Sequence, residues 1–458
     1  MGKVFNDISQ QTIGKLCEQI ISCNNIDAQD YERFRIKRGL RNADGTGVMA
    51  GITNVCSVEG YYIDDGEVVP REGRLRFRGI NMERIVEACE KENRFGFEEV
   101  AWLLIFGSLP DADELKLFTS MLGNLRELPE DFIEDMIMKA PSPNIMNKMA
   151  RSVLSLYSYD DNAEDTSLEN VVNQCVQLIA KMPVLMGYAY QVKRRHYYKQ
   201  SMFIHPIDPT HTTAQAVLSS IRADASFTDE EAKLLDVCLM VHAEHGGGNN
   251  STFANRVLTS SGTDTYSAFA AGIGALKGPR HGGANIKVRE MVNYIKSDIT
   301  DITDEGQVAD ALKKIMRREL GDGSGLIYGM GHAVYTLSDP RAKILRAHAE
   351  KVALGTEFEK DFLLLKNIEQ LTPEIFAEAK GLTKEMCANV DLYSGLVYSM
   401  LGIPEDLFTP IFTVARMAGW SAHRIEELLT GGRIIRPAYK SASNKGKVSY
   451  VPIDERNK

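Results

Sequence analysis

The chain has 458 residues, which exceeds the usual size of one hydrophobic core, so we expect two domains or one large core with an appended lobe. Hydrophobic residues make up 44% and charged residues 25%, as in globular proteins, and no apolar run approaches the roughly 18 residues that cross a bilayer. The net charge of -9 disfavours a broad nucleic-acid-binding face, which would need a basic surface.

The N-terminal sequence MGKVFNDISQQTIGKL contains no apolar signal-peptide core, and the acidic Asp7 argues against an Arg-rich transit peptide. We therefore expect a cytoplasmic protein. The seven cysteines are scattered and form no CxxC pair, so neither disulfides nor a structural zinc site is expected.

The first part of the chain predicts helical material followed by a small hairpin. Residues 6–40 have a polar helical pattern, and the glycine-rich residues 42–51 predict a linker or turn. β-Branched and aromatic residues alternate in 53–63 and again in 74–80, on either side of the turn-rich residues 64–73. This pattern predicts a β-hairpin.

From Met82 onward apolar residues recur at three- and four-residue spacing almost without interruption, which predicts a mainly α fold. Helix-start signals support this prediction: Thr228 precedes an acidic first turn, and Asp339 precedes Pro340. The clearest helical segments before residue 200 are 97–107, 113–125, 130–140, 145–157 and 168–190.

Histidines beside glycines are the first indication of chemistry. His242 and His245 lie in VHAEHGGGNNSTF, His281 in GPRHGGAN and His332 in YGMGHAVY. Glycine allows a ligand to approach the backbone closely and leaves N–H groups to bind an anion. One such loop is more often a structural turn, but three loops at helix edges indicate a functional site.

The position of each histidine predicts its charge. His245 ends the predicted helix 229–245, where the helix dipole favours a cation suited to a carboxylate. His281 precedes the predicted helix 282–296, where the dipole favours a neutral imidazole that can donate a hydrogen bond to a developing enolate.

Arginines and one aspartate complete the pattern. Arg416 interrupts the apolar run 407–420, where an unpaired guanidinium is costly, so it needs an anionic partner or ligand. Guanidinium groups bind carboxylates bidentately, which suits a dicarboxylate. Asp391 stands at the head of an apolar helix, as an N-cap or as a general base.

The segments HAEHGGGNNS, GPRHGGAN, GMGHAVYTLSDPR and NVDLYSG resemble the citrate synthase family, and the match runs from about Gly51 to Tyr439. The resemblance implies that His281 stabilises the enol of acetyl-CoA, that His332 polarises the oxaloacetate carbonyl and that Asp391 removes the methyl proton. The oxaloacetate-binding set that it implies consists of His245, Arg341, Arg416, Arg436 and Asn249, with Ser251 nearby.

The same resemblance implies a two-domain multihelical fold. The large domain would comprise residues 1–282 and 403–458, and residues 283–402 would form a small, mobile, CoA-binding domain. The enzyme would be an acyltransferase of the tricarboxylic acid cycle that hydrolyses citryl-CoA to citrate and CoA, with acetyl-CoA as a substrate and no cofactor. It would be a homodimer in which Arg436 reaches the partner's site.

Three alternatives remain. One is a non-catalytic, CoA-binding regulatory relative, which is disfavoured because all the proposed catalytic side chains are present. A 2-methylcitrate synthase would use propionyl-CoA, and one methylene in an apolar pocket changes discrimination by only about 1 to 3 kcal/mol. A metal-dependent hydrolase would use His242, Glu244 and His245 with Asn249 or His281, but no HExxH motif is present and metal sites gather carboxylates rather than arginines.

Overall fold

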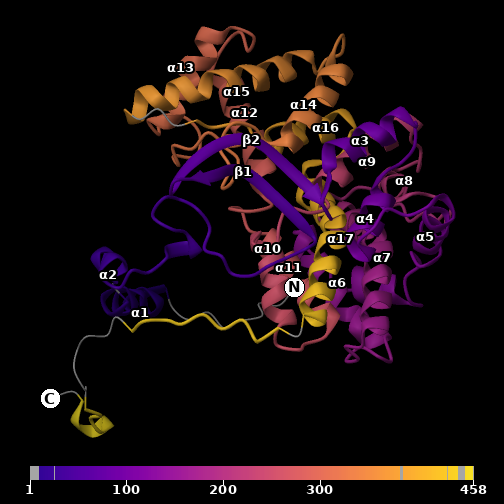
Figure 1. Cartoon of the computed structure of the whole chain (residues 1–458), viewed down its shortest axis with the longest axis horizontal. Helices are drawn as coiled ribbons and strands as arrows, with labels where there is room; N and C mark the ends of the chain where they lie inside the picture. The colour runs from indigo at the N-terminus through magenta and orange to yellow at the C-terminus, as the bar shows by residue number, and fades with distance from the viewer. Residues whose placement is uncertain (1–9, 25, 382–384, 431, 442–448, 457–458) are drawn as a thin grey trace. The chain divides into compact units, whose positions relative to one another are not determined.

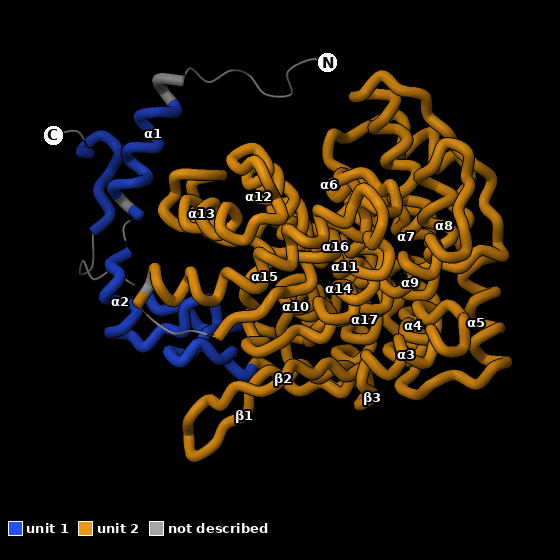
Figure 2. Tube along the Cα trace, turned by 90° about the horizontal axis from the view of Figure 1, so that it is seen from above, with its two compact units in different colours: residues 1–49, 436–458 blue, residues 50–435 orange. Residues whose placement is uncertain are grey.

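The computed structural model describes residues 10–24, 26–381, 385–430, 432–441 and 449–456. The chain forms two compact units, residues 1–49 with 436–458 and residues 50–435, coloured separately in Figure 2.

The smaller unit contains α1 (Gln10–Cys23), α2 (Ala28–Arg33) and two short 3-10 turns at Arg38–Leu40 and Ile453–Glu455. Asp27 caps α2 by accepting a hydrogen bond from the backbone N–H of Gln29 at 2.9 Å. The predicted helical character of residues 6–40 is confirmed over Gln10–Cys23 and Ala28–Arg33, and residues 6–9 lie outside the described chain.

The larger unit begins with a three-stranded antiparallel sheet of β1 (Cys56–Asp64), β2 (Glu67–Phe77) and β3 (Ile80–Asn81), in that order. The predicted hairpin is confirmed, but the prediction that residues 64–73 form its turn is wrong. The turn consists of Asp65 and Gly66, both with positive φ (46° and 87°). Asp-Gly is a preferred two-residue hairpin turn because its twist matches that of the paired strands.

The rest of this unit is almost entirely helical, as predicted. Its helices are α3 (Met82–Lys91), α4 (Phe97–Phe106), α5 (Ala112–Asn124), α6 (Ile145–Leu156), α7 (Leu168–His196), α8 (Thr213–Ile221), α9 (Asp229–His242), α10 (Asn250–Thr259), α11 (Thr265–Leu276), α12 (Ala284–Asp298), α13 (Glu305–Met316), α14 (Pro340–Ala353), α15 (Glu359–Lys380), α16 (Val390–Met400) and α17 (Phe408–Leu429).

The predicted helix starts are confirmed at two sites. Thr228 and Glu231 form a reciprocal capping box at the start of α9, and Asp339 caps α14 with Pro340 in its first turn. The segment predicted as a helix over 130–140 instead contains a π-helix at Ile133–Met138 flanked by turns. Periodicity alone did not distinguish this wider helix from an α-helix.

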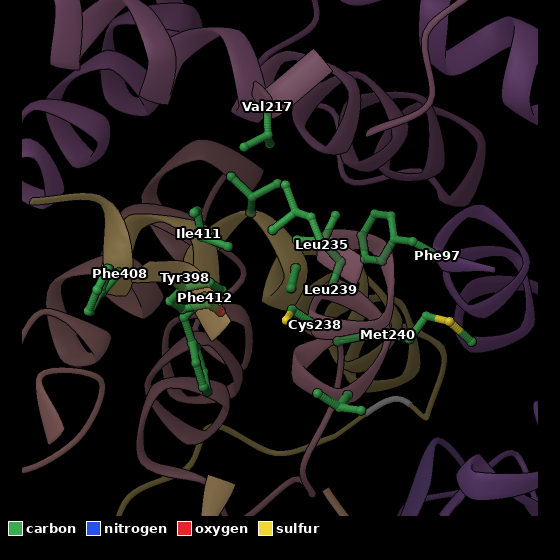
Figure 3. Close-up of a cluster of buried hydrophobic side chains, with 14 of the residues drawn as sticks. Phe97, Val217, Leu235, Cys238, Leu239, Met240, Tyr398, Phe408, Ile411 and Phe412 are labelled. Carbon is green, nitrogen blue, oxygen red and sulfur yellow. The ribbon is translucent and has the colours of Figure 1, made fainter. Parts of the chain in front are cut away.

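α17 forms the centre of the core, because nearly all of its residues are buried and it packs against α4, α7, α9 and α10 (Figure 1). Figure 3 shows one part of this core, where Phe408 and Phe412 of α17 lie beside Tyr398 of α16; the ring centroids of Phe408 and Tyr398 are 5.3 Å apart. Buried helices of this kind hold the polar side chains that interrupt them in fixed positions.

The helices from α12 to α16 pack mainly on one another at one end of the larger unit (Figure 1). Their span is close to the predicted small domain 283–402, whose mobility stays a prediction. Within the described residues, no helix has the length and apolar character required to cross a membrane.

Candidate active site

The segment between α9 and α10 carries the first part of the site. α9 ends at His242, so His245 lies in the following turn and not in the helix as predicted. Gly246 has a φ of 90°, and a Cβ there would lie 3.2 Å from Val58, so a residue without a side chain suits this turn. Asn249 then precedes α10, and its Oδ1 lies 3.0 Å from the Ser251 hydroxyl.

Ser251 links this segment to His281. The Ser251 Oγ lies 3.0 Å from His281 Nε2, and His281 stands in the turn that leads into α12. Burial, together with the charge of Arg416, lowers the pKa of His281 to about 4. The predicted neutral state of His281 is confirmed, and its main cause is burial.

His332 lies in the loop before α14, and its backbone surroundings fix its tautomer. Its Nδ1 accepts hydrogen bonds from the backbone N–H groups of Val334 (3.0 Å) and Tyr335 (3.1 Å). The proton of the neutral ring is therefore on Nε2, which makes Nε2 a donor. The ring stacks on Tyr335 with centroids 4.7 Å apart and meets the edge of His245 at 5.0 Å.

The predicted cationic state of His245 is wrong. Its Nε2 is buried with no hydrogen-bond partner among the described residues. Burial, with the neighbouring Arg341, His332 and Arg416, holds the pKa of His245 well below its usual value. The helix dipole that the prediction invoked is not available, because the helix ends three residues earlier.

Arg341 is buried and forms an ion pair with Asp339, the residue that caps the same helix. Its Nε and Nη2 donate to the Asp339 carboxylate at 3.0 and 2.7 Å, in a bidentate ion pair. Its guanidinium carbon lies 6.0 Å from the centre of the Tyr335 ring. Arg341 is thus a fixed positive charge beside His332 and His245.

Arg416 is fully buried in α17, and most of its hydrogen-bonding capacity is unused. Its Nε donates to the His242 carbonyl at 2.8 Å, whereas Nη1 and Nη2 have no partner within the described chain. Burial lowers the pKa of Arg416 to about 10. A buried guanidinium with unpaired donors is costly, so this arrangement favours an anionic ligand.

Asp391 is the second residue of α16, and its carboxylate does not cap the helix. Asn389 is the cap: its Oδ1 accepts from the Asp391 N–H at 3.0 Å, and its Nδ2 donates to the Gly331 carbonyl at 2.9 Å. Asn389 thus ties Asp391 to the His332 loop. Burial raises the pKa of Asp391 to about 7, against the opposing charges of Arg341 and Arg416.

These groups act on one another electrostatically. Arg416 influences the pKa values of His245, His281 and Asp391, and Arg341 influences those of His245 and Asp391. Residues from three loops and three helices, spread over about 170 positions of the sequence, therefore share one site. Arg436 belongs to the other compact unit, where it is exposed, and its predicted role stays a prediction.

Three residues of this environment were not predicted to belong to the site. Asn389 and Asp339 stand two residues before Asp391 and Arg341, so their local spacing was the available signal. His423, whose Nε2 lies 3.0 Å from Glu244 Oε1, has no such signal, because the two are 179 residues apart in sequence.

The metal-hydrolase alternative is not supported by the positions of its residues. The His242 ring packs against Phe412 at 4.3 Å, and Glu244 is bound by His423 and the Gly246 N–H. Within the described part of the chain, no three His, Cys, Asp or Glu side chains are grouped so that they could hold a metal ion.

Known proteins resemble this chain over most of its length. The family model described as "Citrate synthase, C-terminal domain" matches residues 44–438. The chain is 32% identical to the citrate synthase of Haloferax volcanii over 92% of its own length and 99% of that protein, and 31% identical to 2-methylcitrate synthase 1 of Corynebacterium glutamicum over 86% and 96%. A solved structure of citrate synthase from Thermotoga maritima matches with a TM-score of 0.72, at 26% identity, over 92% of this chain and 100% of that one. The chain belongs to the citrate synthase family.

Proposed function

We propose that this protein condenses acetyl-CoA with oxaloacetate and then hydrolyses the citryl-CoA intermediate to citrate and CoA. The observation that carries the proposal is the buried Arg416, whose unpaired donors lie within electrostatic reach of His281 and Asp391. A related citrate synthase from Thermoplasma acidophilum, with a TM-score of 0.72 and 25% identity over 92% of this chain and 99% of that one, has been solved with carboxymethyl coenzyme A and oxaloacetate.

The first step is removal of a methyl proton from acetyl-CoA. Asp391 is the base, and its pKa of about 7 makes it a much stronger base than an ordinary carboxylate while leaving it ionised above neutral pH. His281 donates a hydrogen bond to the thioester oxygen, where negative charge develops. Because the pKa of His281 is about 4, its ring is neutral near pH 7 and donates this hydrogen bond through its one remaining N–H.

The tautomer of His281 depends on Ser251 and Asn249. His281 Nε2 is hydrogen-bonded to Ser251 Oγ, so the donor to the substrate is Nδ1–H. This requires Ser251 to donate its single proton to His281. The structure places Asn249 Oδ1 3.0 Å from Ser251 Oγ, so the proposed tautomer requires the opposite orientation of the Asn249 amide, with its NH2 group donating to Ser251 Oγ.

The second step joins the enol to oxaloacetate. Arg416 binds a carboxylate of oxaloacetate with its two unpaired amino groups, and Arg341 and His245 complete this pocket. His332 donates from Nε2 to the keto oxygen, which makes the carbonyl carbon electrophilic. The new C–C bond gives citryl-CoA, and water then cleaves the thioester to release citrate and CoA.

The proposed enzyme is a homodimer in which Arg436 of each subunit completes the partner's oxaloacetate pocket, and closure of residues 283–402 over the substrates excludes water until hydrolysis. Through these two features, the binding energy of oxaloacetate is used to orient acetyl-CoA for the reaction.

The test is an assay of thiol release with oxaloacetate and either acetyl-CoA or propionyl-CoA. We expect kcat/KM to be higher for acetyl-CoA. A higher value for propionyl-CoA would reassign the protein as a 2-methylcitrate synthase. No thiol release with either substrate, from protein that binds oxaloacetate, would refute catalysis.

A further inference from the structure

Glu244 is a fully buried carboxylate to which the proposed mechanism gives no role. Its Oε1 accepts hydrogen bonds from the Gly246 N–H at 2.5 Å and from His423 Nε2 at 3.0 Å. Its Oε2 has no hydrogen-bond partner among the described residues. A buried carboxylate oxygen without a donor calls for a compensating charge nearby.

That charge is on α17. Arg416, Gly419 and His423 are spaced by three and four residues, so they share one face of the helix. Arg416 binds the His242 carbonyl, and a Cβ on Gly419 would lie only 2.1 Å from Glu244 Oε2. The chain from His242 to Glu244 therefore runs along this face, and the Glu244 carboxylate lies at the helix turn between Arg416 and His423.

His423 is held in one orientation and one tautomer. Its Nδ1 lies 2.8 Å from Nη1 of Arg256, which can only donate, so Nδ1 accepts and the ring proton is on Nε2. Arg256 is fixed in turn by Glu426 at 2.9 Å and Glu427 at 2.8 Å. His423 thus donates to Glu244 Oε1 and turns Oε2 toward the Gly419 side.

The same contacts determine the charge of Glu244. Burial on its own would raise the pKa of Glu244, but the interactions with His423 and Arg416 lower it, so the carboxylate is ionised. Arg416 and Glu244 attract each other across the helix turn without a hydrogen bond, which leaves Nη1 and Nη2 of Arg416 for a ligand.

We propose that Glu244 is a positioning residue that serves as the built-in counter-ion of Arg416 and thereby sets the affinity for the dicarboxylate substrate. This inference rests on the proposed role of Arg416 as an oxaloacetate ligand. Glu244 stabilises the ligand-free site, and it repels the carboxylate that Arg416 attracts. It therefore weakens the binding of oxaloacetate and citrate and allows the product to leave.

The decisive variant is Glu244→Gln, which keeps an oxygen for His423 and the Gly246 N–H but removes the charge. We expect its melting temperature without ligand to fall, and the dissociation constants of both oxaloacetate and citrate, measured by calorimetry, to fall roughly tenfold. A residue that only holds the loop in shape would give the opposite change in affinity. Unchanged or weaker oxaloacetate binding by the folded variant would overturn the proposal.

Glu426→Gln is the matched control, because it removes a carboxylate from the same network on the far side of His423. We expect it to lower the melting temperature while leaving the oxaloacetate dissociation constant within about twofold. A tenfold tightening in this control would show that the network, rather than the charge of Glu244, controls affinity, and would overturn the proposal.

A third variant tests the proposed role of Arg416 separately from the counter-ion role of Glu244. Arg416→Gln should abolish measurable oxaloacetate binding; if it does not, the proposed role of Arg416 fails. If it does and Glu244→Gln does not tighten binding, only the counter-ion role fails. Should Glu244→Gln be unfolded alone, oxaloacetate should restore its far-ultraviolet circular dichroism, and no recovery at saturating oxaloacetate would count against the proposal.

Discussion

Asp391 and its neighbours decide the protonation chemistry at the scale of single residues. Burial favours the neutral acid, whereas Arg341 and Arg416 favour the carboxylate, and the balance gives a pKa of about 7. A carboxyl group with this pKa changes its charge across the neutral range, unlike an ordinary aspartate. Its ionisation should therefore govern the pH profile of the reaction.

We predict that kcat/KM for acetyl-CoA rises with pH through about 7 and falls about tenfold per unit on the acid side, because the base must be ionised.

Asp391→Asn should lower kcat at least 1,000-fold, on the order expected for loss of a catalytic base, while oxaloacetate binding persists. Turnover within tenfold of wild type would refute the role of Asp391.

The same pKa shift affects stability with a definite sign. The folded pKa of about 7 lies above the usual value near 4, so the neutral carboxyl group contributes stability that is fully present at acid pH and lost as pH rises through 7. Asp391→Asn, which is always neutral, should therefore melt higher than wild type at pH 8 and show no such gain at pH 4.

Asn249 offers a test of the His281 tautomer. Asn249→Asp can only accept from Ser251, so Ser251 can no longer donate to His281 Nε2, and Nδ1 loses the proton that it must present to the thioester. We predict a fall in kcat of roughly 100- to 1,000-fold, as for other lost oxyanion donors. Asn249→Ala, which leaves the Ser251 proton available to His281, should lose less than about tenfold.

At the scale of elements, helix ends position the reactive groups. Asn389 both caps α16 and binds the Gly331 carbonyl, so one side chain fixes the base relative to the loop that carries His332. Thr228 caps α9 in a comparable way, at the end of that helix remote from His242. The two caps make a matched pair, of which only one contacts the site.

We predict that Asn389→Ala and Thr228→Ala each lower the free energy of unfolding by about 1 kcal/mol, the usual value of an N-cap. Only Asn389→Ala should also lower kcat, by roughly 10- to 100-fold, because the distance between the base Asp391 and His332, which donates to the keto oxygen, would no longer be fixed. Chemical denaturation and steady-state kinetics measure both effects. Equal kcat values for the two variants would show that the cap does not position Asp391.

At the scale of the whole molecule, the proposed homodimer would complete the oxaloacetate site. The site described in residues 50–435 contains two buried arginines, and the third arginine predicted to bind oxaloacetate, Arg436, belongs to the other compact unit. We proposed above that each subunit supplies this arginine to its partner. A closed two-fold dimer would then contain two composite sites.

Mixing inactive Arg436→Ala and inactive Asp391→Asn subunits tests this arrangement. After exchange, half of the dimers are mixed and each has one complete site, so roughly a quarter of wild-type activity should return. Exchange is verified by native mass spectrometry of differently tagged subunits. Mixed dimers without activity would show that Arg436 acts within its own subunit or outside the site.

The sequence determined much of the fold because its signals are local. Apolar spacing predicted most helices, Thr228 and Asp339 marked helix starts, and alternation of residue types predicted the hairpin. It did not resolve the two-residue Asp-Gly turn, because Pro70 and its polar neighbours in β2 resemble a longer turn. The need of Arg416 for an anion also followed from its apolar neighbours in the sequence.

Only the tertiary structure decided the charge states of His245 and Asp391 and the partners of the site residues. His245 is neutral and Asp391 has a pKa near 7 because burial and the charges of Arg341 and Arg416 act through space, from residues distant in sequence. The contact between Glu244 and His423 joins positions 179 residues apart. Desolvation and Coulomb interactions depend on three-dimensional distance, which residue spacing along the chain does not encode.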